Sequence, residues 1–335
     1  LEQNMAVPTP ESLLALLKKS KLLEAEQLAL AEQAAEEADD ARSLAKTLVR
    51  KRLLTLWQAN QLLRGKRVFH VGKYKLIESL GSGGMGSVFL AEHTTMGRNV
   101  ALKVIPKQFG RDPASFKQFL TEARAIAALD HPNIVHAYNV DNEGDHYYIA
   151  MEFVEGKDLK RTVEAEGPLE CDRAAGYIRQ AAEGLAHAHG RDMIHCDVKP
   201  ANLLVNGQDV VKILDMGMAR LIGPKKSEGS EKDERLLGTV DYLAPEQALE
   251  SAELDHLVDV YSLGCTFYFL LTGRPPFPEG TLHERIVKHQ TQQPQEITEL
   301  RHDAPEDLVE VCRKMMAKDP GDRYQSAEEV SQAPV

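Results

Sequence analysis

The residues whose chemistry is easiest to assign lie in one stretch, residues 193–205. Asp197 could accept a proton from a hydroxyl group, and Lys199, two residues later, could hold a phosphoryl oxygen. Asn202 could bind a metal ion together with Asp215 of the downstream Asp-Met-Gly sequence. An acid, a cation and an amide at these offsets could together serve phosphoryl transfer to a hydroxyl group.

This stretch resembles the catalytic loop of protein kinases, whose usual form is His-Arg-Asp-x-Lys-Pro-x-Asn followed by Asp-Phe-Gly. Cys196 stands where Arg is usual, and Met216 stands where Phe is usual. Neither change removes a group that does chemistry. The resemblance implies a base, a phosphoryl-neutralising cation and two ligands of Mg²⁺ (or Mn²⁺), in the order Asp197, Lys199, Asn202 and Asp215.

A glycine-rich segment precedes this loop and fits the pattern G-x-G-x-x-G-x-V. It could be a tight hairpin or a dinucleotide fingerprint, but the fingerprint requires a helix after the glycines. A strand pattern follows here, so we expect a hairpin whose backbone amides approach phosphates. By resemblance the ATP site includes Leu80, Gly81, Ser82, Gly83, Gly84, Met85, Gly86, Ser87 and Val88.

Lys103 lies inside the apolar strand expected at residues 100–105. A cation in such a strand is costly unless it is paired, and Glu122 on the amphipathic helix that follows is the expected partner. By resemblance Lys103 holds the α- and β-phosphates of ATP. The same resemblance places Ala101 and Val88 on one side of the adenine and Leu204 on the other.

Residues 150–156 connect the last expected strand of the sheet to the first helix of a larger helical region. By position they resemble the kinase hinge, where adenine bonds main-chain atoms of Glu152 and Val154. Met151 would then be the gatekeeper. Asp158 either contacts the ribose or caps a helix.

The downstream sequence Gly-Thr-x-x-Tyr-x-Ala-Pro-Glu, together with Lys199, resembles the serine/threonine class of protein kinases. It implies that Thr239 bridges Asp197 and Lys199. Three other residues have expected structural roles: Glu246 pairs with Arg323, and Asp259 holds the backbone of the catalytic loop from a buried helix.

The formal net charge of −11 argues against a general binder of nucleic acids or anionic membranes, because both need basic patches. The cysteines are scattered and form no C-x-x-C pair, so we expect a reducing cytoplasm. No signal peptide is recognised, and no apolar run approaches the roughly 20 residues of a membrane helix.

Residues 5–66 contain almost no glycine and no strand pattern. Thr9, Asp40 and Thr55 are expected to begin helices, and leucines recur at helical spacing between them. We expect three or four short helices, packed as a bundle or against the rest of the chain. Residues 1–66 could serve self-association or could be a solvated leader without function.

The resemblance covers residues 74–331 and implies an α+β, bilobal protein-kinase fold preceded by a small all-α segment. We expect a leader at 1–70 and a kinase domain at 71–335, with an antiparallel β lobe at 74–152 that carries one main helix and a helical lobe at 156–331. The expected activity is transfer of the ATP γ-phosphate to serine or threonine hydroxyls of protein substrates. The alternatives are a pseudokinase scaffold and, third, a small-molecule kinase.

Overall fold

The computed structural model describes residues 9–83, 86–105, 125–144, 146–216, 240–249 and 254–334. The chain divides into two compact units. The sheet unit comprises Leu1–Lys117 and Tyr138–Phe153, and the helical unit comprises Gln118–Ala137 and Val154–Val335. One division therefore falls between Phe153 and Val154, inside the segment expected to be the hinge.

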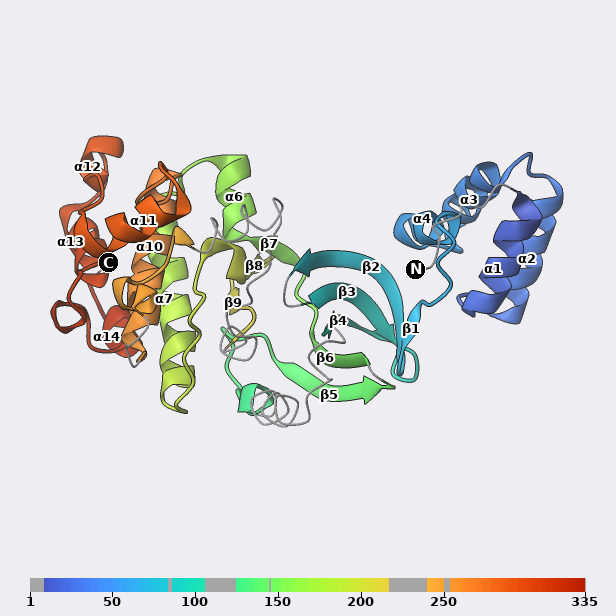
Figure 1. The fold of residues 1–335 in the computed structure, drawn as a ribbon, viewed down its shortest axis with the longest axis horizontal. Helices are drawn as coiled ribbons and strands as arrows, with labels where there is room; N and C mark the ends of the chain where they lie inside the picture. The colour runs from blue at the N-terminus through green and yellow to red at the C-terminus, as the bar shows by residue number, and fades with distance from the viewer. Residues whose placement is uncertain are drawn as a thin grey trace. The chain divides into compact units, whose positions relative to one another are not determined.

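The sheet unit begins with four short helices, which are blue in Figure 1. Three of these helices begin at the predicted residues, Thr9, Asp40 and Thr55. In each, the side-chain oxygen of that residue accepts a hydrogen bond from a backbone amide of the first turn. The helices share an apolar core in which Leu13, Leu44 and Leu62 are fully buried. The helices are α1 (Pro10–Ser20), α2 (Ala25–Glu36), α3 (Ala41–Arg50) and α4 (Leu56–Leu63).

The last of these helices also packs against the β-sheet. The Gln58 side-chain amide, 5% exposed, donates to the Leu76 carbonyl at 2.8 Å, and the Thr55 hydroxyl donates to the Ile77 carbonyl at 2.7 Å. Trp57 packs edge-on against Phe69 and tilted against Phe89, with ring centroids 5.9 and 5.7 Å away. The leader helices therefore form a bundle that is also docked on the sheet.

Trp57→Ala should destabilise the sheet unit. The side chain is half-buried, so we expect a loss of about 2 kcal/mol, below the roughly 3–5 kcal/mol of a fully buried Trp→Ala change. Calorimetry should show a melting temperature lowered by about 4–8 °C. Leu56→Ala on the same helix is the matched control, because Leu56 is 66% exposed and should leave the transition unchanged. Equal melting temperatures for the two variants would show that docking contributes nothing to stability.

The sheet has six strands in the order β1-β2-β3-β4-β6-β5. The pairs from β1 to β6 are antiparallel, and the strands curl together in Figure 1. The strands are β1 (His70–Val71), β2 (Tyr74–Gly83), β3 (Gly86–His93), β4 (Arg98–Val104), β5 (Ala137–Glu143) and β6 (His146–Glu152).

The sequence pattern of residues 134–140 predicts a strand, but strand β5 begins three residues later, at Ala137. Ile134 instead forms an isolated parallel bridge to Ile213, and the Val135 amide donates to the Ile213 carbonyl at 3.0 Å. This short segment is therefore held by the helical unit before the chain enters the sheet. Asp112 and Pro113 predict the start of the amphipathic helix that carries Glu122, and this helix lies largely outside the described residues.

The helical unit is built around α10 (Leu257–Thr272), every residue of which is buried except the last. Its contacts include α7 (Cys171–His189), α13 (Glu306–Met315) and α14 (Ala327–Ser331). The unit also contains α6 (Leu159–Glu166), α11 (Leu282–Thr291), α12 (Ile297–Leu300) and a small antiparallel sheet of β7 (Gly156–Asp158), β8 (Leu203–Asn206) and β9 (Val211–Ile213). The sequence pattern predicts helices at 172–190, 255–272 and 306–317, and these agree with α7, α10 and α13 within two residues.

Candidate active site

Three of the predicted catalytic-loop residues meet through their side chains. The Lys199 ammonium lies 2.9 and 2.8 Å from the two carboxylate oxygens of Asp197. The Asn202 amide nitrogen donates to the Asp197 carbonyl at 2.8 Å and to its carboxylate at 3.1 Å. The Asp197 carboxylate is therefore fixed in orientation by a cation and an amide.

The backbone under this cluster is held by Asp259 of α10, which is fully buried. Its two carboxylate oxygens accept hydrogen bonds from the His195 and Cys196 amides, each at 2.8 Å. His189 Nε2 lies 2.9 Å from the same carboxylate. A buried carboxylate is stable only when it is well hydrogen-bonded, and these contacts provide that. The predicted role of Asp259 is confirmed.

Hydrogen bonds also join this loop to the segment that carries Asp215. The His195 ring nitrogen Nε2 lies 2.8 Å from the Leu214 carbonyl oxygen, and the Leu214 amide donates to the Asn202 carbonyl at 2.9 Å. Cys196 and Asp215 have φ angles of 63° and 56°, a left-handed conformation that is uncommon for residues other than glycine. Such backbone conformations cluster at functional sites. Asp215 therefore directly follows Leu214, whose backbone amide is hydrogen-bonded to the backbone of Asn202.

Met216, which replaces the usual Phe, is 2% exposed. Methionine is unbranched and adapts to irregular spaces in a core. A methionine can therefore fill the buried position at which Phe is usual.

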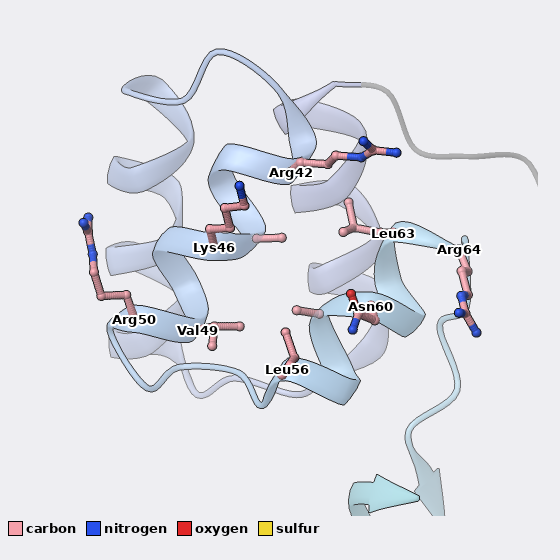
Figure 2. A pocket seen from close by; sticks show the side chains of 10 residues that line it. Arg42, Lys46, Val49, Arg50, Leu56, Asn60, Leu63 and Arg64 are labelled. Atoms are coloured by element: carbon pink, nitrogen blue, oxygen red, sulfur yellow. The ribbon is translucent and has the colours of Figure 1, made fainter.

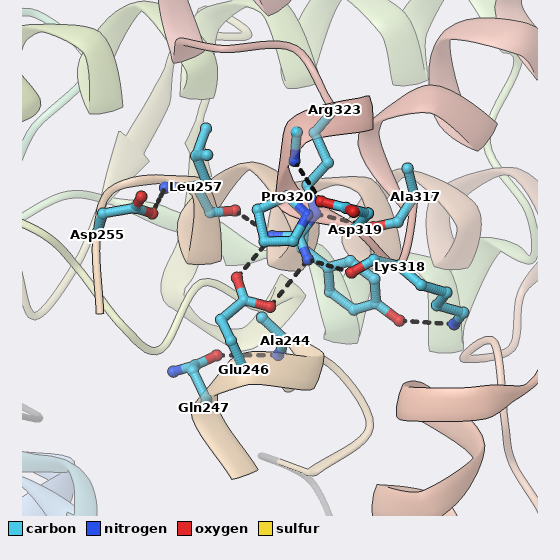
Figure 3. A network of polar contacts seen from close by, with 12 residues as sticks. Ala244, Glu246, Gln247, Asp255, Leu257, Ala317, Lys318, Asp319, Pro320 and Arg323 are labelled. Atoms are coloured by element: carbon cyan, nitrogen blue, oxygen red, sulfur yellow. Dashed lines mark hydrogen bonds and ion pairs between the residues drawn. The ribbon is translucent and has the colours of Figure 1, made fainter. Parts of the chain in front are cut away.

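The pair predicted between Glu246 and Arg323 is present and bidentate. The two guanidinium NH groups lie 2.6 and 2.9 Å from the Glu246 carboxylate oxygens, and the Arg323 side chain is fully buried (Figure 3). The remaining guanidinium bonds go to the carbonyls of Ala317, Leu257 and Lys318. Nearby, burial lowers the pKa of the Lys318 ammonium to about 8. The pair between Glu246 and Arg323 anchors the short 3-10 helix at Pro245–Ala248.

Gln247 is a residue whose role the sequence did not reveal. Its side-chain amide donates to the Cys196 carbonyl at 2.9 Å, and its amide oxygen accepts from the Ala244 amide at 2.9 Å. It links the Ala-Pro-Glu segment directly to the catalytic loop. The only local sign of this role was the position of Gln247 next to Glu246. That position did not predict the contact, because a glutamine there is equally compatible with an exposed helix.

Four of the predicted nucleotide residues of the sheet unit, Val88, Ala101, Lys103 and Met151, share one face of the sheet. Gly81, Ser82 and Gly83 of β2 pair with Val88, Ser87 and Gly86 of β3, so the expected hairpin is confirmed. Paired residues lie on the same face of a sheet, and the register pairs Val88 with Lys103 and Ala101 with Met151. The opposite face carries Val100, Leu102 and Phe89 and receives Trp57 of the leader.

Lys103 is only 2% exposed, as a cation inside the sheet must be. Ala101 is also buried, whereas Leu80 at the end of the glycine-rich strand is 39% exposed. Glu152 ends β6, and Val154 is the first residue of the helical unit after the division. Gly84, Met85, Glu122 and Thr239 lie outside the described residues.

Asp158 caps a helix. Its carboxylate accepts a hydrogen bond from the Arg161 amide at 2.9 Å at the start of α6, and it also lies 3.3 Å from the Arg161 side chain. In the small sheet, Asp158 pairs with Leu204 of β8, which is half-buried. Of the two interpretations left open for Asp158, the helix cap is observed.

Comparison with known proteins gives the class to which this architecture belongs. The protein kinase domain model matches residues 74–335. A crystal structure of the Mycobacterium tuberculosis PknI kinase domain matches with a TM-score of 0.62 and 27% identity, covering 78% of this chain and 94% of that one. The chain therefore belongs to the protein kinase domain family.

Its relatives among curated proteins include bacterial serine/threonine-protein kinases. The chain is 35% identical to PrkC of Bacillus subtilis over 269 residues, which cover 80% of this chain and 41% of that protein. It is 38% identical to PknB of M. tuberculosis over 262 residues, which cover 77% and 42%. The chain thus spans about two-fifths of the length of these relatives. Among the residues that the structure describes, no helix is long and apolar enough to cross a membrane.

Proposed function

We propose that this chain transfers the γ-phosphate of ATP to serine or threonine hydroxyls of protein substrates. The observation that carries the proposal is the Asp197 carboxylate, oriented by Lys199 and Asn202 on a backbone that buried Asp259 holds. The names of its relatives support the same class of substrate. None of the four cysteines, all of which lie in the described residues, forms a disulfide bond, which suits a reducing, ATP-supplied compartment such as the cytoplasm.

In this proposal, Asp197 orients the acceptor hydroxyl and takes its proton as the oxygen attacks the γ-phosphorus. The bond to the β,γ-bridging oxygen breaks, and ADP leaves with that oxygen. Lys199, already beside the carboxylate, neutralises the transferring phosphoryl group. Lys103 holds the α- and β-phosphates, while the hairpin amides of Gly81–Gly86 and the main chain of Glu152 and Val154 position the nucleotide.

The donor set fits Mg²⁺, or Mn²⁺ in its place. Both hydrogen bonds of the Asn202 side chain are donated by its nitrogen, which leaves its carbonyl oxygen as a ligand, and Asp215 offers a carboxylate. Such hard oxygen ligands, completed by waters and phosphate oxygens, are those that Mg²⁺ prefers. When bound, the ion neutralises charge on the phosphates.

The test is phosphotransfer from radiolabelled ATP to a Ser/Thr-containing protein such as myelin basic protein, with the modified residue identified by mass spectrometry. We expect phosphoserine or phosphothreonine and no transfer in EDTA. A thermal-shift titration with ATP, with and without Mg²⁺, is run in parallel. Nucleotide binding without any turnover would contradict the proposal and would identify a scaffold.

The presence of Cys196 predicts that phosphorylation of the activation segment, residues 215–246, is not what activates the enzyme. Where kinases have Arg at this position, the guanidinium pairs with a phosphate on that segment and orders it. A neutral thiol cannot form that charge-assisted bond, which contributes about 1.5–3 kcal/mol. Phosphatase-treated protein should therefore transfer phosphate without a lag.

The measurement is the initial rate of dephosphorylated protein, with mass spectrometry over the first turnovers. Ser227→Ala with Ser230→Ala should cost little; both positions lie outside the described residues. A lag that ends only as the segment becomes phosphorylated would contradict the prediction. Arg220 or Arg235, also outside the described residues, would then be the substitute cation.

A further inference from the structure

A groove runs between α3 and α4 of the leader and has a volume of about 730 Å³ (Figure 2). It lies in the sheet unit and shares no residue with the predicted phosphotransfer site. The lining contains positions i, i+3, i+4, i+7 and i+8 of α3 and the same positions of α4, the last of which is the C-cap residue Arg64. This spacing means that one continuous face of each helix is turned toward the groove.

The floor of the groove is apolar. Ala45 and Ala59 are 4% and 2% exposed, and Val49 and Leu63 are half-buried. Figure 2 shows Val49, Leu56 and Leu63 pointing into the space between the helices. Leu56 is 66% exposed, and it belongs to the same apolar lining as Val49 and Leu63, so it is part of a patch rather than an isolated surface side chain. Its burial would remove apolar surface from water, so the groove favours an apolar occupant.

The edge of the groove is cationic. Arg42, Lys46 and Arg50 follow one another at four-residue steps on α3, and Arg64 follows α4. None of the four forms an ion pair with a carboxylate in the described part of the chain. From residue 41 to residue 66 the sequence contains no Asp or Glu, although the whole chain carries a net charge of −11.

Like charges at four-residue spacing destabilise a helix. Within the described residues, the Asp40 carboxylate at the start of α3 interacts electrostatically with Arg42, but no ion pair is formed along this row. A stripe of unpaired cations beside an apolar floor is complementary to a ligand that is both acidic and apolar. The α3 helix has ten residues, so the groove matches about three turns of a partner helix.

We propose that this groove binds an acidic amphipathic helix of a partner protein. Its large apolar side chains, one turn apart, enter the groove beside Val49, Leu56 and Leu63. Its Asp and Glu side chains flank that stripe and face Arg42, Lys46, Arg50 and Arg64. This is the helix-in-groove mode of recognition, in which apolar anchors supply affinity and flanking charges select orientation.

Two other occupants fit the groove less well. An anionic membrane is matched by a convex apolar face, whereas this floor is recessed between cationic side chains. A second copy of the chain could offer α2, which is acidic, but that helix has one large exposed apolar side chain, Leu30 at 44% exposure, among its described residues. A groove lined by Val49, Leu56 and Leu63 accommodates more than one anchor.

The first experiment uses the full chain and a labelled, end-capped synthetic peptide of about four helical turns. The peptide has Leu at i, i+3, i+4 and i+7 and Glu at the flanking positions. The matched control peptide has Lys in place of every Glu. Fluorescence anisotropy should show binding of the Glu peptide that weakens as salt is raised, and at least about tenfold weaker binding of the Lys peptide. Equal binding of the two peptides would overturn the proposal.

The second experiment compares paired variants of the full chain. Lys46→Glu and Leu56→Ala should each weaken peptide binding about tenfold. Lys51→Glu and Leu30→Ala are the matched controls, because these exposed side chains lie outside the groove, and they should leave binding unchanged. Circular dichroism verifies that each variant is folded.

Three further results would overturn the proposal. The first is equal peptide affinity across all four variants. The second is an absence of peptide binding combined with binding to phosphatidylserine vesicles that Lys46→Glu abolishes, which would identify a membrane. The third is a dimer, seen by sedimentation, that both Leu30→Ala and Leu56→Ala dissociate, which would identify a second copy as the occupant.

Discussion

Asp197→Asn should lower kcat at least about 100-fold, because a positioned general base contributes roughly 10²–10⁴ in rate. Asparagine preserves the size of the side chain but cannot take the proton of the attacking hydroxyl. Lys199 and Asn202 would still find an oxygen acceptor, so the loop that Asp259 holds should keep its conformation. Nucleotide affinity should therefore stay close to that of the wild type.

The measurement is steady-state phosphotransfer at saturating ATP, together with a nucleotide titration followed by thermal shift. Asp192→Asn is a matched control, since Asp192 is exposed, lies just before the loop and has a φ of 58° that asparagine tolerates. It should retain full activity. An Asp197→Asn protein with more than about a tenth of wild-type kcat would show that another group takes the proton.

Lys103→Met should also inactivate the protein, but through the nucleotide. The Lys103 side chain lies in the sheet at 2% exposure, and methionine, which is unbranched and one heavy atom shorter, fills most of the same space without charge. The sheet should therefore remain folded, while the contact to the α- and β-phosphates is lost. Removing one preorganised charged group of this kind costs about 10²–10³ in kcat.

Activity is measured as kcat and KM for ATP, and the melting temperature is measured in the same samples. Lys75→Met in β2 is the control, because Lys75 is a partly exposed lysine of the same sheet that pairs with Glu92 at 2.9 Å. It should change neither constant by more than about twofold, since exposed ion pairs contribute little. Wild-type kcat for Lys103→Met at saturating ATP would remove Lys103 from the mechanism.

Local signals in the sequence predicted most of the leader and of the catalytic loop. The side chains of Thr9, Asp40 and Thr55 bond amides three residues away, so their helix starts could be predicted from neighbouring residues alone. The separation of Asp197, Lys199 and Asn202 is likewise fixed by a short piece of chain. The pair between Glu246 and Arg323 was predicted only through the family resemblance.

Contacts between distant segments were not visible in the sequence. Ile134 continues an apolar pattern that favours a strand, yet it bonds Ile213, and only the folded chain decides between these partners. The side chain of Gln247 reaches a carbonyl on another segment, at Cys196. Docking of Trp57 on the sheet was left open for the same reason, because periodicity shows that a helix has an apolar face but not what covers it.

The contact between α4 and β2 has a thermodynamic consequence. Gln58 and Thr55 bond the carbonyls of Leu76 and Ile77, on the strand that ends in the glycine hairpin. Linkage between two binding sites is reciprocal. If a ligand on the leader prefers the position that β2 adopts around a nucleotide, it raises nucleotide affinity by some factor, and the nucleotide raises the ligand's affinity by that same factor. The leader would then report whether the kinase domain is loaded, as well as influence its loading.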